Sequence, residues 1–175
     1  ETPAYDGRHV AEVLDADFTE HGAPLVARLD RAKCHETDDV LSVFRRHGVL
    51  LLHGPPRHPQ YYGQLERQNR EHRAWLVCGL VPGEALGPAL ARMRAALNGL
   101  WRRPTLNWLT AEEVWMLRPP INDNRDELHD WVHERAAHIR EDDVPGDLAM
   151  RLAIEQALTE RGYLKVIPGL QVLCG

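Results

Sequence analysis

An apolar run that ends in an acid decides the fold of this chain: Pro24-Leu25-Val26-Ala27-Arg28-Leu29-Asp30. A second apolar run, Val49-Leu50-Leu51-Leu52-His53, has no polar residue before its histidine. The first run predicts a strand, and the second, which lacks polar alternation, predicts a strand that is buried on both faces, as in a parallel sheet. Helical periodicity precedes the first run over residues 8–20, and a second helix fits between Thr37, its expected N-cap, and His47. The order helix, strand, helix, strand predicts an α/β fold with right-handed crossovers.

A third helix is predicted after the loop of residues 54–63, and it carries a second acid, Glu66. Three prolines in this loop remove backbone donors and stiffen the connection. Glu66, Arg70 and Arg73 are spaced i, i+4 and i+7, so they share one face of the helix. Between Asp30 and Glu66 lie 35 residues. The sequence therefore places one acid after a strand and another at the start of a helix.

This order of elements resembles the second half of the catalytic core of DDE transposases and retroviral-type integrases. The stretch His58-Pro59-Gln60-Tyr61-Tyr62-Gly63-Gln64-Leu65-Glu66-Arg67 is similar to the segment that leads into the catalytic Glu of that family. Residues 98–115, with Leu109-Thr110-Ala111-Glu112, resemble its closing segment. The family usually has Asp-Asn-Gly after the strand. This chain has Asp30-Arg31-Ala32 and then His35, which resembles an Asp-x-Ala-x-x-His version in a related group of transposases.

The resemblance, nearest to a bacterial insertion-sequence transposase, implies part of an RNase H-like α/β core. It implies that Asp30 and Glu66 are catalytic, and that they are ligands of Mg²⁺ (or Mn²⁺) in metal-dependent phosphoryl transfer on DNA. It implies DNA contacts by four arginines: Arg57, Arg67, Arg70 and Arg73. The first acid of the family has no match, because only 29 residues precede Asp30. We therefore expect an N-terminally truncated core, a fragment or degenerate remnant, that is inactive by itself.

The residue types alone leave other interpretations open. An Asp after a strand is commonly a turn or cap residue, and an exposed Glu66–Arg70 pair stabilises a helix by only a few tenths of a kcal/mol. One alternative is a non-catalytic DNA-binding or assembly module that keeps the basic helix face. Another is a small soluble interaction protein in which both acids are structural. Failure to bind any DNA at low salt would favour the second alternative.

The charges of this 175-residue chain are unevenly distributed around a formal net charge of −5. Residues 57–103 hold eight Arg and three Glu, whereas residues 110–161 hold six Arg and thirteen acids. A local positive field attracts a phosphate backbone even when the total charge is negative. The basic segment coincides with the predicted Glu66 helix and the segment after it. A solvated charged face would give the same pattern.

The composition changes after Pro119-Pro120, which predicts two domains. Residues 1–118 form the partial catalytic core, and residues 119–175 form a helical C-terminal extension of unknown role. Two polar helices are predicted in the extension, over residues 125–140 and 146–161.

Three widely spaced cysteines, Cys34, Cys78 and Cys174, form no pairing framework and favour a reducing compartment. The apolar runs are too short to cross a bilayer, and no signal segment is visible. We therefore expect a cytoplasmic bacterial protein that is associated with the nucleoid when bound to DNA. The resemblance also implies self-association of the intact transposase. No membrane and no small-molecule substrate are expected.

Overall fold

The computed structural model describes residues 6–54 and 62–165. The chain forms two compact units. The sheet unit consists of residues 1–58 and 121–175, and the helical unit consists of residues 59–120. The sequence predicted a catalytic core over residues 1–118 and an extension over residues 119–175. That assignment of roles stays a prediction.

The sheet unit begins with helix α1, Gly7–His21, which leads into strand β1, Val26–Leu29. Asp6 caps the helix, because its carboxylate accepts a hydrogen bond of 2.9 Å from the backbone N–H of His9. Gly22 ends the helix with a φ of +84°, a conformation that glycine adopts without a Cβ clash. The helix stop before the first strand therefore lies where the sequence predicted it.

Helix α2, Asp38–Arg46, precedes strand β2, Leu50–His53. The two strands pair in parallel, with Val26 opposite Leu50 at the start of the ladder. The parallel pairing that the two apolar runs predicted is confirmed.

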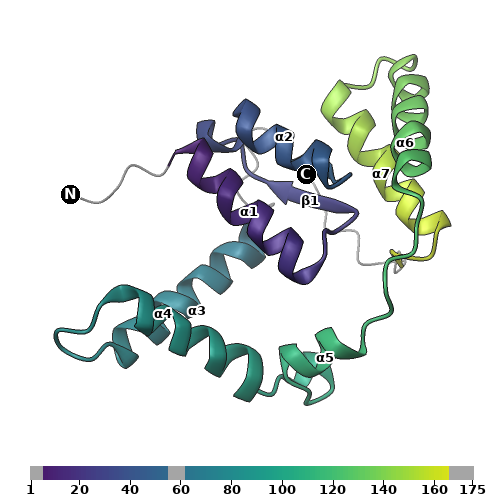
Figure 1. Ribbon diagram of the computed structural model, residues 1–175. Helices are drawn as coiled ribbons and strands as arrows, with labels where there is room; N and C mark the ends of the chain where they lie inside the picture. The colour runs from purple at the N-terminus through teal and green to yellow at the C-terminus, as the bar shows by residue number, and fades with distance from the viewer. Residues whose placement is uncertain (1–5, 55–61, 166–175) are drawn as a thin grey trace. The chain divides into compact units, whose positions relative to one another are not determined.

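Alternate residues of the two strands pack against two different layers of helices. Figure 1 shows the ribbons of α1 and α2 beside β1. One layer contains α1 and α2, and its buried residues are Val10, Ala11, Phe18, Val40, Val43, Phe44 and Val49, with Ala27, Leu29 and Leu51 packed against them. The other layer contains α6, Arg125–Arg140, and α7, Gly146–Glu160. Its buried residues are Leu25, Leu50, Leu128, Val132, Ala136, Ala153, Ile154 and Ala157, with Val26 and Leu52 packed against them.

Arg125, the first residue of α6, fixes this second layer to the segments that precede both strands. Its Nη1 donates hydrogen bonds to the carbonyls of Pro24, at 2.8 Å, and Gly48, at 2.9 Å, and its Nη2 donates to the carbonyl of Ala23, at 2.6 Å. Gly48 has a φ of +58°, and a Cβ there would lie 3.0 Å from the Arg125 side chain. The helices after residue 120 therefore complete the layered packing of the sheet.

The helical unit consists of α3, Gly63–Gly79, α4, Leu86–Ala95, and α5, Ala111–Leu117. A π-helical segment, Ala96–Leu100, continues α4. Three apolar residues of α4 and this segment are buried: Ala89, Met93 and Leu97. None of the helices in the described part of the chain is long and apolar enough to cross a membrane.

Two helices start with different caps. A capping box starts α5: Thr110 Oγ1 accepts from the N–H of Glu113 at 3.1 Å, and the Glu113 carboxylate accepts from the N–H of Thr110 at 2.8 Å. Thr37 occupies the N-cap position of α2, but its hydroxyl makes no capping bond. The reason is packing, because the Thr37 side chain lies against Gly7, where a Cβ would collide with it.

Candidate catalytic and DNA-binding site

Asp30 directly follows β1, as predicted, and its carboxylate is more than half exposed. Asp30 Oδ1 accepts a hydrogen bond of 3.1 Å from the N–H of Ala32, which closes a local turn. A 3₁₀ turn, Lys33–His35, then brings the His35 ring back, so that His35 Nδ1 lies 2.6 Å from Asp30 Oδ1. The structure therefore combines the turn role of Asp30 with an exposed carboxylate at the end of a strand, where open α/β sheets bind ligands.

The segment after Asp30 is also held by ion pairs. The guanidinium of Arg31 pairs with Asp147 in the first turn of α7, and it lies 4.0 Å from Glu36. Asp30 therefore lies between the end of β1 and Arg31, whose side chain is paired with α7.

Glu66 lies in the first turn of α3, where the helix dipole favours a negative charge. Its side chain and those of Arg67, Arg70 and Arg73 are all exposed. None of the four forms an ion pair with another described residue, so the surface Glu66–Arg70 pair is not formed. The predicted DNA-binding residue Arg57 lies outside the described residues.

The two predicted metal ligands belong to different units, Asp30 to the sheet unit and Glu66 to the helical unit. Their proximity stays a prediction. Over residues 6–54 and 62–165, no three His, Cys, Asp or Glu side chains are grouped so that they could hold a metal ion. Asp30 and His35 supply two donors, and one of them is an imidazole, whereas Mg²⁺ prefers an octahedral set of oxygens. The donors among the described residues of either unit therefore do not fit a complete site for Mg²⁺.

Sequence reasoning missed a polar cluster between α1 and α2. Arg46 Nη1 lies 3.0 Å from both Asp15 carboxylate oxygens, and His47 Nε2 lies 2.7 Å from Asp15 Oδ1. The hydrogen bond to His47, together with the charge of Arg46, holds the pKa of Asp15 below its usual value. No spacing rule relates residues 31 positions apart, so only the packed structure reveals this cluster.

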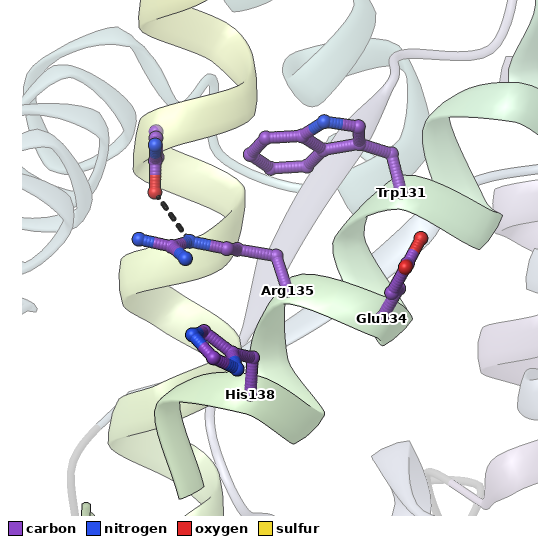
Figure 2. A pocket seen from close by; sticks show the side chains of 5 residues that line it. Trp131, Glu134, Arg135 and His138 are labelled. Carbon is purple, nitrogen blue, oxygen red and sulfur yellow. Dashed lines mark hydrogen bonds between the residues drawn. The ribbon is translucent and has the colours of Figure 1, made fainter.

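A shallow hollow of about 430 Å³ lies between α6 and α7, and none of the predicted site residues lines it (Figure 2). It is lined by Trp131, Glu134, Arg135, His138 and Gln156. Arg135 Nε donates a hydrogen bond of 2.8 Å to Gln156 Oε1, drawn dashed in Figure 2. The bond joins the two helices of this layer, so Arg135 and Gln156 have a structural role.

Solved structures with a similar fold include two of integrases. One is the cryo-EM structure of the simian T-cell lymphotropic virus intasome in complex with PP2A regulatory subunit B56 gamma. The match has a TM-score of 0.60 at 17% sequence identity, over 68% of this chain and 44% of that chain. The other is the catalytic core domain of BIV integrase, with a TM-score of 0.55 at 20% identity, over 65% of this chain and 73% of that chain. No protein-family model and no curated protein match the sequence.

This likeness establishes the fold. The chain contains part of the RNase H-like α/β fold of integrase catalytic cores, followed by further helices, so the predicted fold class is confirmed. It spans less than half the length of the intasome chain that it matches. The bacterial insertion-sequence origin and the roles of Asp30 and Glu66 stay predictions.

Proposed function

We propose that this chain is part of the catalytic core of a DNA integration or transposition protein, and that it contacts DNA phosphates through α3. The observation that carries the DNA contact is the exposed row Arg67, Arg70 and Arg73 behind Glu66. Residues 59–120 hold eight Arg and five Glu, a positive excess in an otherwise acidic chain. The integrase-like fold supports the same function. Self-association and a cytoplasmic, nucleoid-associated location belong to this proposal.

Phosphate contacts of this kind are tested by the salt dependence of duplex binding. Each contacted phosphate contributes about −0.9 to the slope of log affinity against log salt, so three to five contacts predict a slope between about −2.7 and −4.5. Replacing both Arg70 and Arg73 with Ala should flatten the slope by about two units. Fluorescence anisotropy of a labelled duplex measures this slope.

The matched control replaces two exposed arginines of the sheet unit, Arg45 and Arg140, with Ala. This control variant should keep the slope of the parent protein. Equal slopes for the Arg70→Ala/Arg73→Ala variant and the parent would show that the arginine row of α3 is only a solvated surface. Absence of any duplex binding at low salt would leave the interaction-protein alternative standing.

We infer that the complete catalytic core carries out metal-dependent phosphoryl transfer on DNA. In that core, Asp30 and Glu66 would be among the ligands of Mg²⁺ or Mn²⁺. Because the described donors do not complete such a site, we expect the chain alone to leave a supercoiled plasmid uncut with either ion. Agarose gel electrophoresis separates nicked from supercoiled plasmid. Nicking by the parent that disappears in Asp30→Asn would contradict this expectation and would show that the chain completes its own site.

A further inference from the structure

Residues 101–109 of the helical unit form a loop that holds a tryptophan in an exposed and strained position. Asn107 and Trp108 have φ values of +54° and +62°, in the left-handed region that favours glycine. A bulky residue rarely adopts this conformation, and such strain is concentrated at ligand-binding sites. Burial does not compensate for it, because Trp108 is 65% exposed. Packing within the described residues therefore does not explain why tryptophan occupies this position.

The strained conformation is held by a network of hydrogen bonds. Arg102 Nη1 donates to the Trp108 carbonyl at 2.9 Å, and the same guanidinium makes two bonds, of 3.0 and 2.9 Å, to the Glu113 carboxylate. The Trp108 N–H donates to the carbonyl of Arg103 at 3.0 Å, and the Arg103 N–H donates to the carbonyl of Leu109 at 3.2 Å. The loop thus presents the indole from a fixed backbone.

An ion pair attaches this loop to the helix that carries the proposed phosphate contacts. Arg103 Nη2 lies 3.5 Å from Glu71 Oε1 on α3, and Glu71 directly follows Arg70. The tryptophan and the arginine row therefore belong to one compact unit with an excess of positive charge. Proteins that bind single-stranded nucleic acid combine cations for the backbone with aromatic rings on which bases stack.

We propose that Trp108 is a stacking platform for an unpaired nucleobase of the DNA that α3 contacts. The inference rests on the proposed function, since it requires DNA on the helical unit. Stacking uses the π face that every base has, so it needs no particular sequence. The positive excess of residues 59–120 favours a polyanion over an uncharged partner at this loop.

The test separates the indole ring from the strained backbone by comparing Trp108→Ala with Trp108→Gly. Both substitutions remove the ring, but only glycine relieves the positive φ. Both variants should bind a labelled oligothymidine single strand about fivefold or more weakly than the parent, and Trp108→Phe should restore most of the affinity. Trp108→Gly should also melt at a higher temperature than Trp108→Ala. Anisotropy and thermal unfolding measure the two effects.

The matched control is Trp115→Leu, because Trp115 is also partly exposed in the helical unit but its ring is covered by the Arg118 guanidinium at 3.3 Å. This variant should bind the single strand as the parent does. Parent-like affinity of both Trp108 variants, with the duplex salt slope intact, would overturn the stacking proposal alone. Loss of self-association in light scattering with unchanged single-strand affinity would assign Trp108 to a protein contact. A parent that binds neither strand form would overturn the proposed function as well.

Discussion

Asp15 is the residue whose environment most clearly links pH to the stability of the sheet unit. Its carboxylate contacts His47 and Arg46, and the hydrogen bond from His47 is the main cause of its lowered pKa. A carboxyl group with a lowered folded-state pKa contributes stability above its ordinary value of 3.8. That contribution is lost as the pH falls through the folded-state pKa, because protonation ends the ion pair.

We therefore expect Asp15→Asn to lower the urea midpoint of unfolding near neutral pH, and the difference from the parent to narrow as the pH falls below 3.8. Circular dichroism at a series of pH values measures the midpoints. Asp130→Asn is the control, since Asp130 is exposed on α6 and forms no ion pair with another described residue. A difference for Asp15→Asn that stays constant over this range would contradict the account.

At the scale of elements, Arg125 joins α6 to the segments before both strands through three backbone carbonyls. Arg125→Ala should lower the free energy of unfolding by about 2–3 kcal/mol, because it leaves partly buried carbonyls without donors. Arg125→Lys should recover only part of this loss, since an ammonium group lacks the fork of a guanidinium. Arg140→Ala, an exposed substitution at the other end of α6, should stay within about 0.5 kcal/mol of the parent. Urea unfolding measures all three, and equal effects at the two ends of α6 would contradict this role.

Local sequence patterns predicted where the helices and strands lie, but they did not predict how these elements pack together. The predicted helix 125–140 has the same bounds as α6, because Asn124 caps it and Leu128 and Val132 repeat at helical spacing. The same periodicity shows that one face is buried but not what covers it. The packing of α6 and α7 on the sheet depends on contacts distant in sequence, such as Arg125 with Ala23, and local rules do not reach them.

For the candidate site too, the sequence predicted the elements that carry the acids but not the contacts around them. The strand end at Asp30 and the helix that carries Glu66 were both predicted from their flanking residues. The contact of His35 with Asp30 was not, because it depends on a 3₁₀ turn that the spacing alone does not specify. Nor could the left-handed backbone of Trp108 be foreseen, since the usual signal for it is glycine.

For the whole molecule, the two units differ in sign of charge. Residues 59–120 carry a net charge of +3, from eight Arg and five Glu, and the rest of the chain carries −8, from 13 Lys or Arg and 21 acids. A polyanion is attracted to the helical unit and repelled by much of the sheet unit. The proposed phosphate contacts of α3 therefore belong to the unit that carries the positive excess.

The most direct test of this account is whether Asp30 and Glu66 come together in solution. Acids that share an ion at about 2 Å from each have carboxylates roughly 4–6 Å apart. Asp30→Cys and Glu66→Cys are combined in a protein whose three natural cysteines are replaced. The protein is treated with a short bismaleimide, to which each thiolate adds, and is analysed by mass spectrometry. The control pair joins position 30 to Val77, about 16 Å further along α3. We expect an intramolecular cross-link between positions 30 and 66, and much less cross-linking between positions 30 and 77. Cross-linking that favours 77, or none at 66, would contradict a shared site.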